Sequence, residues 1–155
     1  MCSQRFRCFT LLLGLVIVGL PIACSDADLD DPREVVIALF GAMEKNDEAR
    51  LAHILDLPSL MRNTEEDYAL AGGQPRVFTN PQDILKDLTH DGETKRRWFQ
   101  FQRIVNKAVV TDDVASVEVT FVDKDSSRGY MTNFGLRKTN DKWRIYSFKT
   151  LKDSP

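Results

Sequence analysis

Cysteine is nearly absent from most of this chain. The 155 residues include three cysteines, Cys2, Cys8 and Cys24, and none follows position 24. The remainder therefore has no internal disulfide, no thiol nucleophile and no cysteine-based metal site. Only two histidines occur, His53 and His90, and they are not at the spacing of metal ligands. We therefore expect neither a metal nor another cofactor.

The chain also lacks a strong charge of one sign. It has 21 basic and 23 acidic residues, a formal net charge of −2. Its one basic cluster, Lys95-Arg96-Arg97, follows Asp91 and Glu93 and is interpreted as a solvated face. Binding to nucleic acid requires clustered lysine and arginine, so we do not expect a nucleic-acid partner.

Motifs of common enzyme classes are missing too. The pair Gly72-Gly73 has no phosphate-binding framework around it, and a flexible loop explains it. No serine has the flanking glycines of a nucleophile elbow. The composition, 43% hydrophobic and 28% charged, is that of an ordinary globular protein.

The first 23 residues have the pattern of an export signal. Arg5 and Arg7 precede an almost entirely apolar stretch at 9–20, and a small residue, Ala23, stands before Cys24. One alternative is an uncleaved anchor, but a helix over 9–23 would measure roughly 22 Å against a hydrocarbon core of about 30 Å. The other is ordinary secretion with Cys24 as a free thiol.

The sequence Leu20-Pro21-Ile22-Ala23-Cys24 resembles the lipobox of bacterial lipoproteins, except that Pro21 stands where leucine is usual. This resemblance implies cleavage before Cys24 and attachment of fatty acyl groups, such as palmitate, to its sulfur. Ser25–Asp31 contains four aspartates, so we interpret 24–31 as an acidic tether. We expect a location on the cell membrane or the outer membrane, facing the periplasm or the exterior.

Residues 32–155 are predicted to form one domain that begins with helices. Asp31 and Pro32 suit the start of a helix, and apolar residues recur at helical spacing up to Met43. Asp47 suits the start of a second helix, which runs to about Leu55 and is broken by Pro58. A third, short helix is predicted to start at Asn80 and to include Leu88.

After Trp98 the apolar pattern alternates, which is typical of strands. The residues predicted to share the buried face are Phe99, Phe101, Arg103 and Val105, then Ala115, Val117, Val119 and Phe121, then Tyr130, Thr132, Phe134 and Leu136, then Trp143, Ile145 and Ser147. Short turns at 111–113 and 139–141 and a polar loop at 123–127 separate these four strands. The sequence predicts an α+β fold in which helices cover one face of a curved antiparallel sheet.

Three segments resemble the cone-shaped superfamily named for nuclear transport factor two (NTF2), which includes ketosteroid isomerase and the SnoaL-type cyclases. They are DPREVVIALFGAMEKNDEARLAHIL, DDVASVEVTF and FGLRKTNDKWRIYSF. The resemblance implies a cone with an interior pocket, in which enzymes of the superfamily place an Asp or a His.

That pocket implies a set of candidate side chains in this chain: His53, Asp56, Tyr68, His90 and Tyr130. His53 would be a general base if buried beside Asp56, whereas the alternative is a histidine at the edge of the helix with its ring half in water. His90 precedes Asp91-Gly92 and is expected in a loop. The strand aromatics either line a ligand cavity or fill the core.

Taken together, the sequence predicts a membrane-anchored lipoprotein with a non-enzymatic domain that binds a small apolar ligand or an envelope protein. An enzyme of the isomerase or dehydratase type is the alternative, favoured if His53 and Asp56 face an open cavity. A third interpretation makes the exposed sheet face the surface of a homodimer.

Overall fold

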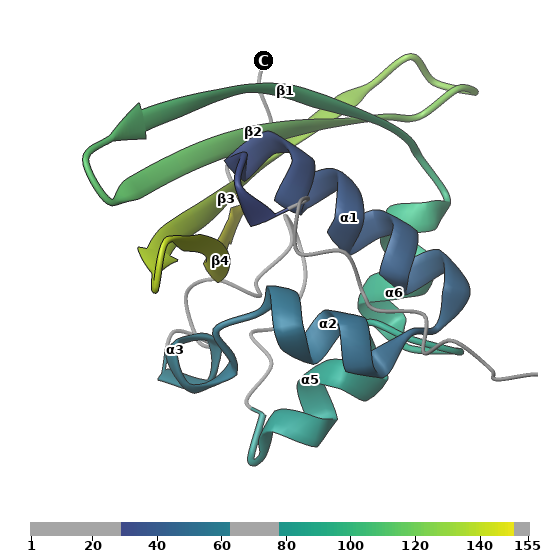
Figure 1. The fold of residues 1–155 in the computed structure, drawn as a ribbon. Coiled ribbons are helices and arrows are strands. Elements are labelled where there is room, and N and C mark those ends of the chain that lie inside the picture. Colours follow the sequence, from purple (N-terminus) through teal and green to yellow (C-terminus); the bar gives the residue numbers. More distant parts are fainter. Residues whose placement is uncertain (1–28, 63–77, 151–155) are drawn as a thin grey trace, which may run out of the picture.

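The computed structural model describes residues 29–62 and 78–150 (Figure 1). The predicted signal peptide at 1–23, the lipidation site at Cys24 and the candidate Tyr68 lie outside the described residues, as does most of the acidic tether. These remain predictions.

The first two helices begin and end where the sequence predicts. Helix α1 (Pro32–Lys45) starts at Asp31, whose Oδ1 accepts hydrogen bonds from the backbone N–H of Arg33 at 2.7 Å and of Glu34 at 3.2 Å. It ends at Asn46, which has the left-handed conformation at φ 57°. Helix α2 (Glu48–Ile54) starts at Asp47, whose carboxylate accepts from the N–H of Arg50.

The break between the second and third helices has a clear structural cause. Helix α2 ends at Ile54, and the N–H of Asp56 donates to the carbonyl of Ile145 in the sheet at 2.8 Å. A further helix, α3 (Leu57–Arg62), then contains Pro58 in its first turn, where a missing N–H costs no hydrogen bond. The next described helix, α5 (Pro81–Asp87), is the one predicted to start at Asn80.

Helix α6 (Glu93–Phe99) is the main element that the sequence interpretation missed. We expected Phe99 in a strand, and this is wrong because α6 runs to Phe99 and the first strand starts only at Gln102. The residue at the N-cap of α6 is Gly92, which has no side chain to accept hydrogen bonds from the first N–H groups of the helix. The buried Asp87 of α5 does so instead, by accepting from the N–H groups of Glu93 and Thr94. A cap six residues away gives no local sequence signal.

Four strands form the predicted antiparallel meander. They are β1 (Gln102–Thr111), β2 (Val114–Val122), β3 (Gly129–Thr139) and β4 (Lys142–Thr150), in that spatial order. Asn140 and Asp141 both have positive φ, at 51° and 60°, which is the geometry of a two-residue hairpin turn between β3 and β4. The fold is therefore α+β, with N-terminal helices packed on a four-stranded antiparallel sheet.

The described helices all lie on one face of the sheet (Figure 1). Helix α1 lies directly against the strands, and α2 and α5 lie farther from them (Figure 1). Paired strand residues share a face, so Val117, Phe134 and Phe148 lie side by side on the covered inner face. We call the other side the outer sheet face; Val109, Ser116 and Gly135 lie on it.

A β-bulge corrects one predicted strand face. Strict alternation puts Ser147 on the inner face after Trp143 and Ile145. The pairing of β3 with β4 shifts between Gly135 and Leu136, so that Phe148 rather than Ser147 follows Ile145 on the inner face. Ser147 is buried beside Gly135 instead.

Candidate functional site

Aromatic side chains pack against one another between the helices and the inner sheet face. Five rings from five different elements meet there: Phe40, Trp98, Phe121, Phe134 and Phe148. Trp98 and Phe134 have ring centroids 5.5 Å apart, and Phe134 and Phe148 are 5.2 Å apart, both edge to face. Such contacts add to the roughly 2–3 kcal/mol that each buried ring contributes through the hydrophobic effect. We call these five residues the aromatic cluster.

One polar atom lies in the aromatic cluster without a hydrogen bond. The indole Nε1 of Trp98 is buried and has no acceptor. Trp98 meets Phe148 at an interplanar angle of 90° with centroids 5.6 Å apart. A buried N–H without an acceptor lowers the free energy of unfolding, so Trp98 is held here by its apolar contacts.

Arg103 covers the edge of the aromatic cluster. Its guanidinium lies 3.8 Å from the centroid of the Phe99 ring and 5.5 Å from that of Phe40, and its Nη1 donates to the carbonyl of Trp98 at 3.2 Å. Burial lowers the pKa of Arg103, and nearby Glu44 opposes this shift. The side chain stays charged and stacks on the rings through cation–π contacts.

Tyr130, one of the predicted site residues, is half-buried beside Phe101. Their ring centroids are 5.4 Å apart. Tyr130 pairs with Phe121 across β2 and β3, so it lies on the inner sheet face as predicted. Its ring packs against the core rather than standing alone.

Asp56 uses its carboxylate to start a helix. Its Oδ1 accepts from the N–H of Ser59 at 3.2 Å and its Oδ2 accepts from the Ser59 hydroxyl at 2.7 Å, while Arg62 donates to that hydroxyl at 2.9 Å. His53 is half-buried near the end of α2. The contacts of Asp56 are those of a helix cap, and this structural role explains the residue without a catalytic one.

The second histidine lies in an exposed loop, as predicted. His90 has a positive φ of 46°, and its N–H donates to Oδ1 of Asn46. Its Nδ1 is 4.0 Å from a carboxylate oxygen of Glu48. These contacts join the α5–α6 loop to the α1–α2 turn. Among residues 29–62 and 78–150 no three or more His, Cys, Asp or Glu side chains are grouped as metal ligands would be.

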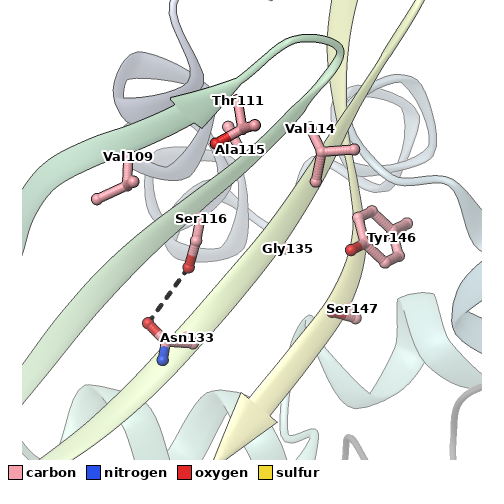
Figure 2. Close-up of a pocket in the computed structure, with 9 residues that line it drawn as sticks. All are labelled: Val109, Thr111, Val114, Ala115, Ser116, Asn133, Gly135, Tyr146 and Ser147. Carbon is pink, nitrogen blue, oxygen red and sulfur yellow. Dashed lines mark hydrogen bonds between the residues drawn. The ribbon is translucent and has the colours of Figure 1, made fainter.

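A cavity on the outer sheet face was not predicted. It measures about 330 Å³ and is lined by side chains of β1, β2 and β4 together with β3 (Figure 2). The lining residues are Val109, Thr111, Val114, Ala115, Ser116, Asn133, Gly135, Tyr146 and Ser147. In the view of Figure 2 the helices lie behind the sheet, and the Ser116 hydroxyl and the Asn133 amide oxygen are joined at 3.5 Å.

Gly135 makes room for this cavity. A Cβ added there would lie 2.5 Å from the Ser147 hydroxyl and 3.1 Å from the Tyr146 ring. The glycine thus lets Tyr146 lie across β3. The sequence signal for this feature is a glycine within a strand. Such a glycine indicates that another group approaches the backbone closely, but it does not identify that group.

The described helices include none that is long and apolar enough to cross a membrane. This finding concerns residues 29–62 and 78–150 only.

Comparison with known proteins identifies the fold. No protein-family model matches the chain. No curated protein matches it either. Among solved structures, one from Streptomyces avermitilis, described as a "putative dehydratase" from the NTF2-like family, has a TM-score of 0.52 and 16% identity over 84% of this chain and 98% of that one. A chain named Rd1NTF2_05 has a TM-score of 0.51 and 16% identity over 77% and 95%. The chain has the NTF2-like fold, as the sequence resemblance implied.

Proposed function

We propose that this chain is a lipid-anchored, non-enzymatic domain of the cell envelope that binds another protein through its surface. The observation that carries the proposal is the aromatic cluster. Enzymes with a cone-shaped fold bind their ligand in the interior of the cone. In this chain Phe40, Trp98 and Phe134 pack against one another in that interior. A filled interior favours a surface-binding role over the small apolar ligand that the sequence left open.

The likeness to a protein described as a dehydratase supports the enzyme alternative only weakly, because at 16% identity it concerns the fold alone. An enzyme of this type needs an acid or base that faces its substrate. Asp56 is occupied as the cap of α3, and this favours the non-enzymatic role.

The acyl groups on Cys24 would attach the protein to the membrane by inserting into the bilayer. Each buried methylene contributes about 0.8 kcal/mol, so one chain binds weakly and two or three hold the protein durably. The described part of the acidic tether leaves the domain next to the β3–β4 hairpin, where Asp30 pairs with Lys142 at 2.7 Å. The anchor and this salt bridge together would set which side of the domain faces the bilayer.

Metabolic labelling with a fatty-acid analogue tests the anchor. The intact chain should incorporate the label and remain with the membrane fraction. The variant Cys24→Ala should lose both, whereas Cys8→Ala, within the predicted signal, should keep both. Incorporation of label into Cys24→Ala would refute lipidation at this residue.

A further inference from the structure

Two arginines on the outer sheet face form no ion pair with any residue that the structure describes. Arg137 of β3 pairs with Val114 of β2 on one side and with Arg144 of β4 on the other, so the three residues lie in one row of the same face. Within the described residues neither arginine forms an ion pair, and the Nε of Arg144 is buried without an acceptor. A buried guanidinium nitrogen that has lost its water is unfavourable unless an acceptor replaces it.

The same arginines lie in one row with residues that line the cavity on that face. The Arg137 guanidinium lies 4.6 Å from the centroid of the Tyr146 ring, and Tyr146 lines the cavity. Val114, in the same row as both arginines, lines it as well. Positive charge and an apolar recess are therefore side by side.

The lining of the cavity indicates what kind of molecule fits. Val109 and Val114 are 69% and 44% exposed, which is high for large apolar side chains. The hydroxyl of Ser116 on β2 and the amide of Asn133 on β3 also line the cavity, and they are suited to the polar groups of a peptide backbone (Figure 2). An acyl chain would need a continuous apolar surface instead.

We propose that this face binds an acidic, extended peptide segment of a partner protein. A carboxylate of the segment would pair with Arg137 and Arg144, and an aliphatic side chain two positions away would enter the recess between Val109, Val114 and Tyr146. In an extended segment side chains alternate in direction, so residues two apart reach the same face. The charge complementarity of two unpaired guanidiniums with a carboxylate selects this occupant.

The place of the cavity in the sheet supports an extended partner. β1, at one edge of the sheet, contributes Val109 and Thr111 to the cavity, whereas the arginines are on β3 and β4. A segment that contacts both must cross the strands, and an extended chain covers such a distance in a few residues. Among the described residues, Asp112 and Asp113 of the adjoining turn form no ion pair with either arginine, and Glu118 on the same face accepts a hydrogen bond from Asn106 instead.

The inference rests on the proposed function, since it names the partner of the same binding domain. The test uses the full chain in a non-ionic detergent and a fluorescein-labelled peptide that repeats Val-Ser-Glu-Ser, in which valine and glutamate stand two positions apart and therefore point to the same side. The comparison peptide has glutamine in place of every glutamate. Fluorescence anisotropy should show binding of the acidic peptide, which weakens as salt is added, and at least tenfold weaker binding of the glutamine peptide.

Variants of the chain assign the binding to this face. Arg137→Gln and Arg144→Gln should each weaken binding of the acidic peptide roughly tenfold, the loss expected for one charge-assisted hydrogen bond. Arg128→Gln is the matched control, because Arg128 is exposed and directly precedes β3, at the end of the strand away from Arg137. Val114→Asp, at an exposed position, should abolish binding without unfolding the core.

Equal binding of the two peptides, or unchanged binding by the double variant Arg137→Gln/Arg144→Gln, would overturn the inference. A concentration-dependent dimer that Val114→Asp dissociates would also overturn it and would assign the face to a second copy of the chain. None of these outcomes touches the anchor, which the labelling of Cys24→Ala tests separately.

Discussion

At the scale of single residues, Gly135 holds the outer sheet face in its observed shape. Its lack of a side chain lets the Tyr146 ring and the Ser147 hydroxyl come within 3.1 Å and 2.5 Å of the place where a Cβ would stand. Both neighbours belong to the β-bulge in β4 and have little freedom to move away, since Ser147 is itself buried. The bulge, the ring and the glycine therefore depend on one another.

Gly135→Ala should consequently destabilise the protein by about 1–3 kcal/mol, the cost of inserting a methyl group into a packed site. Chemical denaturation measures this change. Gly129→Ala is the control on the same strand, because its nearest neighbour, a methyl carbon of Thr120, is 3.9 Å away. If both variants unfold at the same denaturant concentration, the crowding at Gly135 is not what the geometry indicates.

Residue-level sequence reasoning succeeded where a side chain acts on its own neighbours. Asp31 and Asp47 cap helices as predicted, because a cap bonds to an N–H two or three residues ahead. It did not find that Asp56 is a cap, since the break attributed to Pro58 hid the start of α3. It could not find Arg137 and Arg144, which are seven positions apart and meet only through strand pairing.

At the scale of elements, α6 depends on a carboxylate from another helix. Asp87 is 6% exposed, and its carboxylate accepts from the hydroxyl and N–H of Thr94 and from the N–H of Glu93. Gly92 brings the two helices close, because a Cβ there would meet the carbonyl of Asp87. This arrangement orients Trp98, which α6 carries into the aromatic cluster.

Removing that carboxylate should loosen α6 first. We expect Asp87→Ala to lower stability by about 2–3 kcal/mol, since it deletes a helix cap and leaves buried donors unpaired. Hydrogen exchange measured by NMR should show faster exchange in α6 than in β2 and β3. Asp91→Ala, an exposed change in the loop before α6, should alter stability by less than about 0.5 kcal/mol. Equal effects of the two variants would contradict the assigned role of Asp87.

The elements that could be predicted are those with their own periodicity. The helix at Pro32–Lys45 and the strand at Val114–Val122 have clean apolar patterns, and both occur where expected. The seven residues of α6 are too few to show a period, and their cap is distant in sequence. The sequence pattern did not predict that Phe148 lies on the inner sheet face. A β-bulge shifts the alternation of faces in β4, and a bulge has no local sequence pattern of its own.

At the scale of the whole molecule, the fold offers two surfaces to a binding partner, the inside of the cone and the outer sheet face. Aromatic rings occupy the first, with Phe134 fully buried and Trp98 3% exposed. The second has exposed valines, a cavity and two arginines that form no ion pair with the described residues. The sequence resemblance gave the cone but could not say whether its interior is open, because the same aromatic residues at strand spacing can line a cavity or fill it.

The central claim is that the domain holds nothing inside the cone and acts through its surface. Native mass spectrometry of the full chain, released from membranes in a mild detergent, tests this directly. The account predicts the mass of the processed polypeptide with its acyl groups and no other molecule. A further small apolar molecule, bound one to one and lost when the protein unfolds, would contradict it.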